Sequence, residues 1–280
     1  INSDGMIETF PVGAPEESIM FVVGDLPSVY FSDFESYSGD WTIGDESDNA
    51  TAGIWELAEP VATFNDQGIQ LQPESDFSNP GTFCFITGNA NEEGNGGFDD
   101  VDNGKTTLYS PILDLSNYDS VLLSYWYWYT NNIGDNSGND VWNVSVSNDG
   151  GNSWIDIQNT SSSITEWKKN QTILTDLITL TETIQFKFIA EDIAYPGDNG
   201  SGGSLVEAAI DNFLIENIVS NTIQPGDTNN DNQLNVLDVV ILVNMVLGAE
   251  TQNFLTADLN NDAQINVQDI VILINLILEV

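Results

Sequence analysis

The hydrophobic and polar positions divide the chain into two regions of different periodicity. Between residues 29 and 219, short apolar or alternating runs recur between clusters of Gly, Asn, Asp and Pro. Such runs are typical of β-strands separated by turns, and no stretch of this region keeps the spacing of an amphipathic helix. From residue 226 onward, two apolar runs of helical length replace them. The pattern therefore predicts a mainly β protein, in which an antiparallel β-sandwich precedes a small α-helical domain.

The helical region contains an internal repeat. Residues 227–247 (DTNNDNQLNVLDVVILVNMVL) align with residues 258–278 (DLNNDAQINVQDIVILINLIL) at an offset of 31 residues. In each copy, the first, third, fifth, seventh, ninth and twelfth positions follow the ligand spacing of an EF-hand calcium loop, with a backbone carbonyl at the seventh. The predicted Ca²⁺ ligands are Asp227, Asn229, Asp231, Gln233, Asn235 and Asp238 in the first copy, and Asp258, Asn260, Asp262, Gln264, Asn266 and Asp269 in the second.

Both copies differ from an ordinary EF-hand. Gln224-Pro225-Gly226 stands where a first helix would be expected, and the twelfth position is Asp instead of Glu. The sixth position, where Gly usually allows a sharp turn, holds Asn232 and Ala263. A tandem of loop-then-helix units with these features resembles a type I dockerin, and the resemblance covers residues 226–280. The paired EF-hand-like fold of that family is therefore expected here.

The resemblance implies two Ca²⁺ ions and a partner that is a cohesin-domain protein or a cell-surface scaffold. In type I dockerins, the tenth and eleventh loop positions and the facing helix surface bind the partner. The apolar helices agree with such a role independently, because two helices cannot bury an apolar surface that runs all the way round them. The implied partner-binding residues are Val236, Leu237, Val243, Asn244, Val267, Gln268, Ile274 and Asn275.

Physical arguments also favour calcium in residues 226–280. A domain of this size forms only a marginal hydrophobic core of its own. Three carboxylates in each loop would repel one another without a cation. Metal binding would then contribute to the folding free energy, and we expect little stable structure without Ca²⁺.

The β region resembles MAM-type or concanavalin-like jelly-roll modules, which are appended to secreted bacterial hydrolases, notably zinc carboxypeptidases. The stretches that carry the resemblance are FSDFES (31–36), GIWELAEP (53–60), FDDVDNGKTTLYSPILDLS (98–116) and SLVEAAIDNF (204–213). Such modules often hold a structural Ca²⁺ between the first strand, a Gly/Asp loop and the last strand. The resemblance implies Glu35, Asp102 and Asp211 as its ligands here, although solvated loop carboxylates would give the same pattern.

The segment Ser147–Trp154 (SNDGGNSW) matches the Asp-box pattern S-x-D-x-G-x-[ST]-W. In this pattern, Asp149 is expected to accept backbone N–H groups of a turn, the glycines to permit positive φ, and Trp154 to pack underneath. The Asp-box is a folding device of many unrelated β proteins. It therefore predicts a hairpin and no particular activity.

Aromatic residues alternate along the run from Ser124 to Thr130. Trp126 and Trp128 are expected on one face, and the three tyrosines between and beside them on the other. Such aromatics more often belong to a core than to a ligand platform. If the tryptophan face is exposed and concave, however, Trp126 and Trp128 could stack on sugars, and the sandwich would be a carbohydrate-binding module tethered by the dockerin.

The charge balance excludes several classes of partner and of active site. The 280 residues include 44 Asp and Glu, four Lys, no Arg and no His, for a net charge of −40. Such a surface neither neutralises a nucleic-acid backbone nor binds an anionic membrane. No apolar run reaches the roughly 18–20 residues of a membrane span, so no membrane insertion is expected. The acidity itself fits either a solvated halotolerant surface or calcium ligation.

Catalysis by this chain is not expected. Without His, the chain contains no Ser-His-Asp triad, no Cys-His pair and no His-ligated zinc site of a carboxypeptidase. Paired carboxylates could still serve a glycosidase, and Glu207 on an apolar strand is the best single candidate. The single Cys84 forms no intrachain disulfide.

We expect four segments along the chain. Residues 1–28 would be the end of a preceding domain with a linker, residues 29–219 the jelly-roll-like sandwich, residues 220–225 a linker and residues 226–280 the dockerin-like domain. Because the chain begins with Ile1 and has no signal-type segment, we expect a C-terminal piece of a secreted, extracellular or cell-surface-attached bacterial protein. A missing upstream domain, such as a metallocarboxypeptidase, another peptidase or a glycoside hydrolase, would supply the activity.

Overall fold

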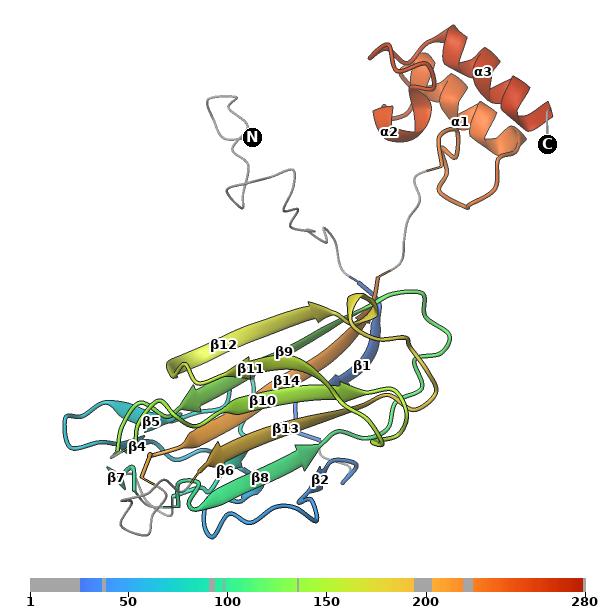
Figure 1. Cartoon of the computed structure of the whole chain (residues 1–280). Helices are drawn as coiled ribbons and strands as arrows, with labels where there is room; N and C mark the ends of the chain where they lie inside the picture. The colour runs from blue at the N-terminus through green and yellow to red at the C-terminus, as the bar shows by residue number, and fades with distance from the viewer. Residues whose placement is uncertain are drawn as a thin grey trace. The chain divides into compact units, whose positions relative to one another are not determined.

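The computed structural model describes residues 26–36, 39–90, 94–97, 99–134, 136–193, 203–218 and 224–278. The chain forms two compact units, residues 1–219 and residues 220–280, shown in Figure 1. The first unit is a β-sandwich of two antiparallel sheets, and the second is a small helical region, so the fold class expected from the sequence is confirmed. Residues 1–25 and 220–223, which hold most of the two expected linkers, lie outside the described residues.

The larger sheet has six strands in the order β12-β9-β14-β6-β3, and β1 pairs with the second half of β14. β12 is an edge strand that the hydrophobic pattern does not predict, because ITEWKKNQTI is mainly polar and none of its residues is fully buried. The strands of this sheet are β1 (Ser28–Ser32), β3 (Trp55–Ala58), β6 (Cys84–Thr87), β9 (Val121–Thr130), β12 (Ile164–Ile173) and β14 (Glu207–Asn217).

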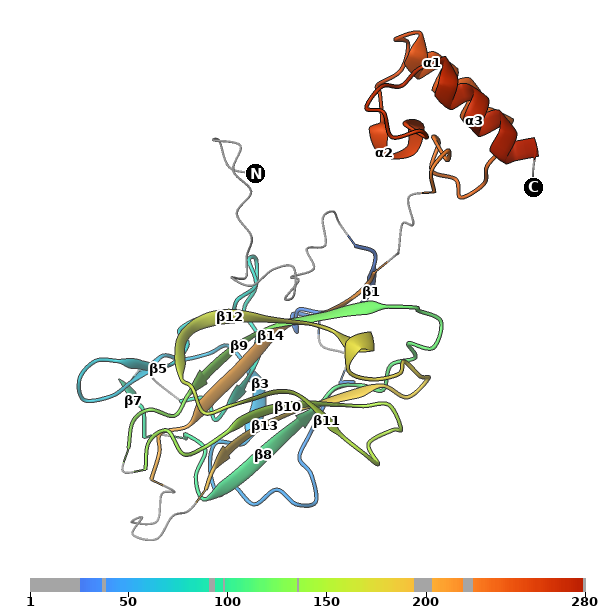
Figure 2. The ribbon, with the colours of Figure 1, turned by 45° about the horizontal axis from the view of Figure 1, so that its top comes forward.

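The second sheet has five strands in the order β11-β10-β13-β8-β2, and Figure 2 shows it as the layer facing β9 and β14. A further small sheet, β5-β4-β7, contains one parallel pair, β4 with β7. A short 3₁₀ turn, η1 (Leu174–Asp176), follows β12. The strands are β2 (Thr42–Ile43), β8 (Gly104–Tyr109), β10 (Trp142–Ser147), β11 (Ile155–Thr160) and β13 (Gln185–Asp192), and in the small sheet β4 (Thr63–Phe64), β5 (Gln70–Gln72) and β7 (Gly94–Asn95).

Aromatic side chains fill the space between the two large sheets. The alternation predicted for β9 is confirmed: Tyr125, Tyr127 and Tyr129 face this core, where Tyr127 stacks on Trp142 of the opposite sheet. β13 alternates strictly between half-buried and buried residues, as expected for a strand with one face on the core. The inward-facing rings therefore fix which face of each strand points toward the opposite sheet.

The helical unit consists of α1 (Val236–Val246), the short α2 (Phe254–Ala257) and α3 (Val267–Leu278). Leu242 and Met245 of α1 pack with Leu273 of α3 in a small core of its own. Leu234 and Ile265, the eighth residues of the two repeats, also belong to this core. None of the described helices is long and apolar enough to cross a membrane.

Gly226 lies where the helical unit begins and has no room for a side chain. Its φ is +99°, and a Cβ there would lie 2.7 Å from Cδ1 of Leu273 and 3.1 Å from Cδ2 of Leu234. The glycine therefore lets the chain pass closely over the core of the helical unit.

We expect Gly226→Ala to destabilise the helical unit by about 2–3 kcal/mol, because it combines backbone strain with a collision in the core. Gly248→Ala is the matched control, since Gly248 also has a positive φ of +74° but open space around it. Helix unfolding followed by circular dichroism measures both variants. Equal losses at the two positions would show that only backbone strain matters.

Candidate functional site

The first Asp-rich loop is held together by side-chain oxygens that accept backbone N–H groups. Asp227 accepts the N–H of Asp231 at 3.1 Å and that of Asn232 at 2.8 Å. Asn229 accepts the N–H of Asp231 at 3.0 Å, and Asp231 accepts that of Gln233 at 2.8 Å. These successive bonds curl the loop around its first, third and fifth residues.

The second loop repeats the same bonds at the equivalent positions. Asp258 accepts the N–H groups of Asp262 and Ala263 at 3.1 and 2.9 Å, and Asn260 accepts that of Asp262 at 3.0 Å. Asp262 in turn accepts the N–H of Gln264 at 2.9 Å. The sequence repeat is therefore also a repeat of backbone conformation.

The sixth residue of each loop adopts the left-handed conformation that the EF-hand spacing requires. Asn232 has φ of +61°, and Ala263 has φ of +62°. Asn tolerates this region well, whereas Ala there costs roughly 1–2 kcal/mol. The loop bonds described above hold Ala263 in this strained conformation.

The twelfth residues, Asp238 and Asp269, have a role that spacing alone did not reveal. Both are fully buried. Asp238 accepts the N–H of Asn235 and forms a capping box with it at the start of α1, while its other oxygen accepts the N–H of Thr228 at 2.9 Å. Each twelfth Asp thereby joins the beginning of its loop to the beginning of its helix. The signal was the N-x-x-D pattern of a capping box.

The chemistry of the two loops fits Ca²⁺. Ca²⁺ binds six to eight oxygens from carboxylates, amides and carbonyls, and both loops supply all three kinds. Among the described residues, no group of three or more Asp, Glu, His or Cys side chains could hold a metal ion. An ion in either loop would therefore also use the amide oxygens of Asn229 or Asn260 and the carbonyls of Gln233 or Gln264.

The three acids that were expected to bind calcium in the sandwich do not all come together. Glu35 and Asp211 lie near each other, but Asp102 is not with them, and its charge instead acts on Asp100 and Asp192. Asp76 is the acid that lies with them, since its charge acts on Asp211 and the charge of Glu35 acts on it. The prediction of Asp102 as the third ligand was wrong. It rested on a resemblance, and the fold places the loop that carries Asp102 away from Glu35 and Asp211.

Backbone N–H groups hold this acidic group in place. Glu35 accepts those of Thr82 and Phe83, both at 2.7 Å, and Asp211 accepts those of Phe77 and Ser78 at 2.8 and 3.0 Å. One oxygen of Asp76 is buried without a partner. Burial is the main cause that raises the pKa of Asp211, to about 6.

The two tryptophans of β9 do not form an open platform. Trp128 is buried on the outer face of the larger sheet, where its ring N–H donates to the carbonyl of Leu71 at 2.7 Å. Trp126 is half-buried and stacks on Phe77, with ring centroids 3.6 Å apart. Of the two predicted stacking residues, Trp128 is therefore excluded, because the segment that contains β5 covers it.

Glu207 is fully buried at the start of β14. One of its oxygens lies 3.3 Å from the side-chain amide of Gln72, and the other has no hydrogen-bond partner. Burial, followed by the charges of Asp100 and Asp99, raises the pKa of Glu207 well above its usual range. A carboxyl group without solvent access does not contact a substrate in this conformation, so Glu207 is not a general acid for one.

The turn from Ser147 to Trp154 is closed by local hydrogen bonds. Asp149 accepts the N–H of Ser153 at 2.9 Å, and the Trp154 ring N–H donates to the carbonyl of Gly151. Gly150 and Gly151 have positive φ. These bonds close the hairpin between β10 and β11 and form no ligand site.

Residues 225–278 match the family model of the dockerin type I domain. The C-terminal unit is a type I dockerin. Domains of this family typically bind calcium and belong to extracellular, cellulosome-type proteins. No curated protein matches the chain.

The sandwich is similar in fold to several solved structures. The K1 cleaved adhesin domain of Lys-gingipain from Porphyromonas gingivalis W83 is 15% identical, with 67% of this chain and 97% of that chain covered and a TM-score of 0.39. The C-terminal family 22 carbohydrate-binding module of Clostridium thermocellum Xyn10B is 9% identical, with 70% and 98% covered and a TM-score of 0.38. TmCBM61, solved with β-1,4-galactotriose, is 14% identical, with 64% and 89% covered and a TM-score of 0.33. Because these sequence identities and TM-scores are low, the similarities to the three structures carry no argument about the ligand or the activity of this chain. They also give no support to the expected link with MAM-type modules and carboxypeptidases, or to the Asp-box.

The dockerin exposes equivalent apolar stripes on its two main helices. Val236, Val240 and Leu247 lie along α1 and its end, and Val267, Val271 and Leu278 occupy the same positions on α3, all more than half exposed. Among the expected partner-binding residues, Leu237, Gln268, Ile274 and Asn275 are also exposed, whereas Val243 and Asn244 are half-buried. Val240 and Val271 were not predicted as partner-binding residues from the sequence, because each lies one helical turn beyond the tenth and eleventh loop positions.

We expect Glu207→Gln to stabilise the sandwich above about pH 5 by roughly 1–3 kcal/mol, because an amide supplies a donor and carries no charge. The raised pKa means that the folded state keeps a proton which the unfolded state releases. The contribution of Glu207 to stability is therefore complete at low pH and falls as the pH rises. Thermal unfolding at acidic and neutral pH measures the difference. Glu216→Gln, at a half-buried position of β14, is the matched control for the loss of one carboxylate from this strand.

Proposed function

We propose that this chain is a non-catalytic, calcium-binding region of a secreted protein, in which the dockerin attaches the molecule to a cohesin-type partner or cell-surface scaffold. The observation that carries the proposal is the pair of equivalent apolar stripes on α1 and α3. A contiguous exposed apolar surface of this kind typically marks a protein partner. Because the internal repeat offers the same stripe twice, two binding orientations are part of the proposal.

Calcium would act on the docking surface through the loops. Asp227, Asp231 and their second-copy equivalents supply carboxylate oxygens, and the twelfth Asp joins each loop to the start of its helix. An ion in the loop would neutralise the carboxylates that otherwise repel one another. The ordered loop would then fix the start of each helix, and with it the position of the exposed stripe.

We also propose a structural Ca²⁺ in the sandwich at Glu35 and Asp211, with Asp76 contributing charge from nearby and neutral oxygens completing the ligands, because no three acidic side chains of the described residues are placed to hold an ion by themselves. The orphaned oxygen of Asp76 supports this assignment. The sandwich itself would be an accessory module of a larger secreted hydrolase, with an upstream peptidase, such as a metallocarboxypeptidase, or a glycoside hydrolase as the catalytic part. Such an arrangement would place that activity on the scaffold through the dockerin.

We expect the full chain to bind a member of a panel of type I cohesins in Ca²⁺ and to lose binding in EDTA. Asp231→Ala combined with Asp262→Ala should abolish binding and reduce helix content, because each loop loses a carboxylate ligand. Calorimetry measures the binding and circular dichroism the helix. Glu250→Gln, an exposed acid outside both loops, should leave both unchanged.

Surface variants test the docking face separately from the metal. Val240→Asp alone should leave the stripe of α3 available, whereas Val240→Asp with Val271→Asp should weaken binding more than a hundredfold, because charges would be buried in an apolar interface. Both residues are exposed, so folding should persist. Full cohesin binding by the double variant would contradict the proposed surface.

A second candidate function is carbohydrate binding by the sandwich. The observation that favours it is a cluster of three half-buried aromatic rings, in which Phe77 stacks on Trp126 and contacts Trp167 edge-on. Rings that are partly exposed on one surface can stack on the apolar faces of sugars. This reading retains Trp126 but not the buried Trp128.

If the aromatic cluster binds glycan, Trp126→Ala should reduce retention on insoluble polysaccharide about tenfold, as expected when a central aromatic contact is truncated. Phe31→Ala is the control, since Phe31 is an exposed aromatic of β1. Pull-down on a set of insoluble glycans measures retention. Absence of retention by the wild-type chain would exclude this second function for those glycans.

A further inference from the structure

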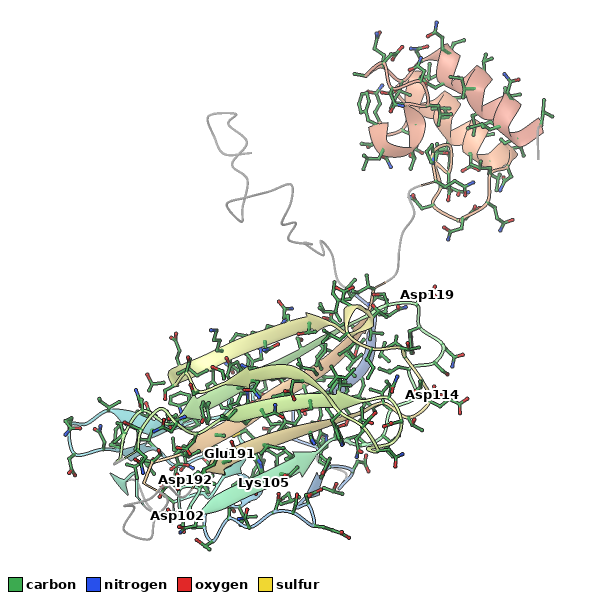
Figure 3. All side chains as sticks on the ribbon, in the orientation of Figure 1. Asp102, Lys105, Asp114, Asp119, Glu191 and Asp192 are labelled. Atoms are coloured by element: carbon green, nitrogen blue, oxygen red, sulfur yellow. The ribbon has the colours of Figure 1, made fainter. Side chains whose placement is uncertain are left out.

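Acidic residues gather inside one end of the sandwich. β13 ends at Asp192, β8 begins at Gly104 and β10 begins at Trp142, so the antiparallel pairing brings these strand ends together. Figure 3 shows Asp102 and Asp192 at this end and Asp119 at the other. The cluster is separate from the acidic group of Glu35, Asp76 and Asp211.

Asp140 and Asp192 face each other across the pairing of β10 with β13. Trp142 is opposite Ala190 in the register, so the positions two residues further on toward the strand ends are Asp140 and Asp192. The N–H of Ile193 donates to Asp140 at 2.8 Å, which confirms the close approach. Both carboxyl groups have no exposed surface.

Each of these two carboxylates is half satisfied. One oxygen of Asp140 accepts the Ile193 N–H, and one oxygen of Asp192 accepts the N–H of Asn103 at 3.4 Å. The other oxygens, Oδ2 of Asp140 and Oδ1 of Asp192, are buried without a partner. Backbone donors thus orient the two groups and leave one acceptor of each unused.

A hydroxyl completes the set of orphaned oxygens. Ser204 is 1% exposed, its Oγ has no partner, and its backbone N–H is near enough to Asp192 to favour the charged form of that carboxyl group. Oδ1 of Asp102, whose charge acts on Asp192, is also buried and unpartnered. Three carboxylate oxygens and one hydroxyl, all buried, therefore lack a partner at this end of the sandwich.

The lysine nearest in register does not neutralise this pair. Lys105 is opposite Glu191, and since successive side chains of a strand point to opposite faces, both lie on the other face of the sheet from Asp192. Burial, followed by the charge of Asp140, raises the pKa of Asp192 to about 7. The two acids thus face each other in the interior without a cation from this lysine.

We propose that Asp140, Asp192 and Ser204 form an interior Ca²⁺ site that joins the ends of β10 and β13 to the segment that leads into β14. A proton shared between the two carboxyl groups would satisfy only one pair of oxygens. A water molecule between them would bring no positive charge to neutralise the carboxylates. A calcium ion accepts several oxygen ligands at once and neutralises both carboxylates. Because no three acidic groups in the described ranges are placed to hold a metal alone, the site combines two carboxylates with neutral oxygens, and Asp102 contributes charge from nearby.

Terbium luminescence tests this site in the full chain. All seven Trp and eight Tyr residues precede residue 196, so the sandwich supplies the sensitising rings and the dockerin contains no Trp or Tyr of its own. Tyr129 lies near the proposed site, since its hydroxyl accepts from Asn131, whose amide also donates to the carbonyl of Asp140. We expect the chelator-treated wild-type chain to show sensitised emission that Ca²⁺ displaces.

Asp140→Asn and Asp192→Asn should each remove one component of this emission, whereas Asp119→Asn, a matched change of an exposed acid at the other end, should not. Glu35→Gln identifies the component that belongs to the other acidic group.

Ser204→Ala keeps both carboxylates and should weaken Tb³⁺ binding about tenfold, which provides a test if an Asn variant fails to fold. Titrations of Asp192→Asn and Ser204→Ala that coincide with the wild type would overturn the site and favour a shared proton. The calcium response of the dockerin helices, measured in the same samples, reports separately on the proposed docking function.

Discussion

The structure depends on one recurring interaction, in which a carboxylate accepts backbone N–H groups. With 44 acids and four lysines, the chain has few cationic side chains to pair with its acids. Asp227 and Asp258 accept the N–H groups of their own loops, while Glu35 and Asp211 accept those of the segment that crosses the outer face of the larger sheet. Such bonds stabilise the charged form of a carboxylate without an ion pair.

This interaction also determines what the dockerin presents. The twelfth Asp of each copy is bonded to the start of its loop and caps its helix, so loop and helix form one unit. The helices bury Leu242, Met245 and Leu273 against each other, and the opposite residues have nothing within the unit to cover them. The exposed apolar stripe on each helix is therefore a direct result of how few elements the domain contains.

In the sandwich, the same interaction satisfies only part of each acidic group. Asp76, Asp140 and Asp192 each keep one buried oxygen without a partner. Backbone N–H groups donate to the other oxygen of Asp140 and to the other oxygen of Asp192. Leaving an acceptor or a charge unpaired in the interior is costly. A cation at these places would remove that cost and tie together strands that are distant in the sequence, and the sandwich would then depend on calcium as we propose for the dockerin.

The sequence by itself determined the two-part organisation, the strand-rich character of residues 29–219 and the repeat of the dockerin. These features are local: strand alternation, turn residues and loop spacing are properties of neighbouring positions. Only the tertiary structure decided that Trp128 is covered, that Glu207 is buried and that β12 is an edge strand despite its polar sequence. It also decided that Asp76, not Asp102, joins Glu35 and Asp211. Which acids meet depends on strand order and register, and those are fixed by contacts between residues far apart in the chain.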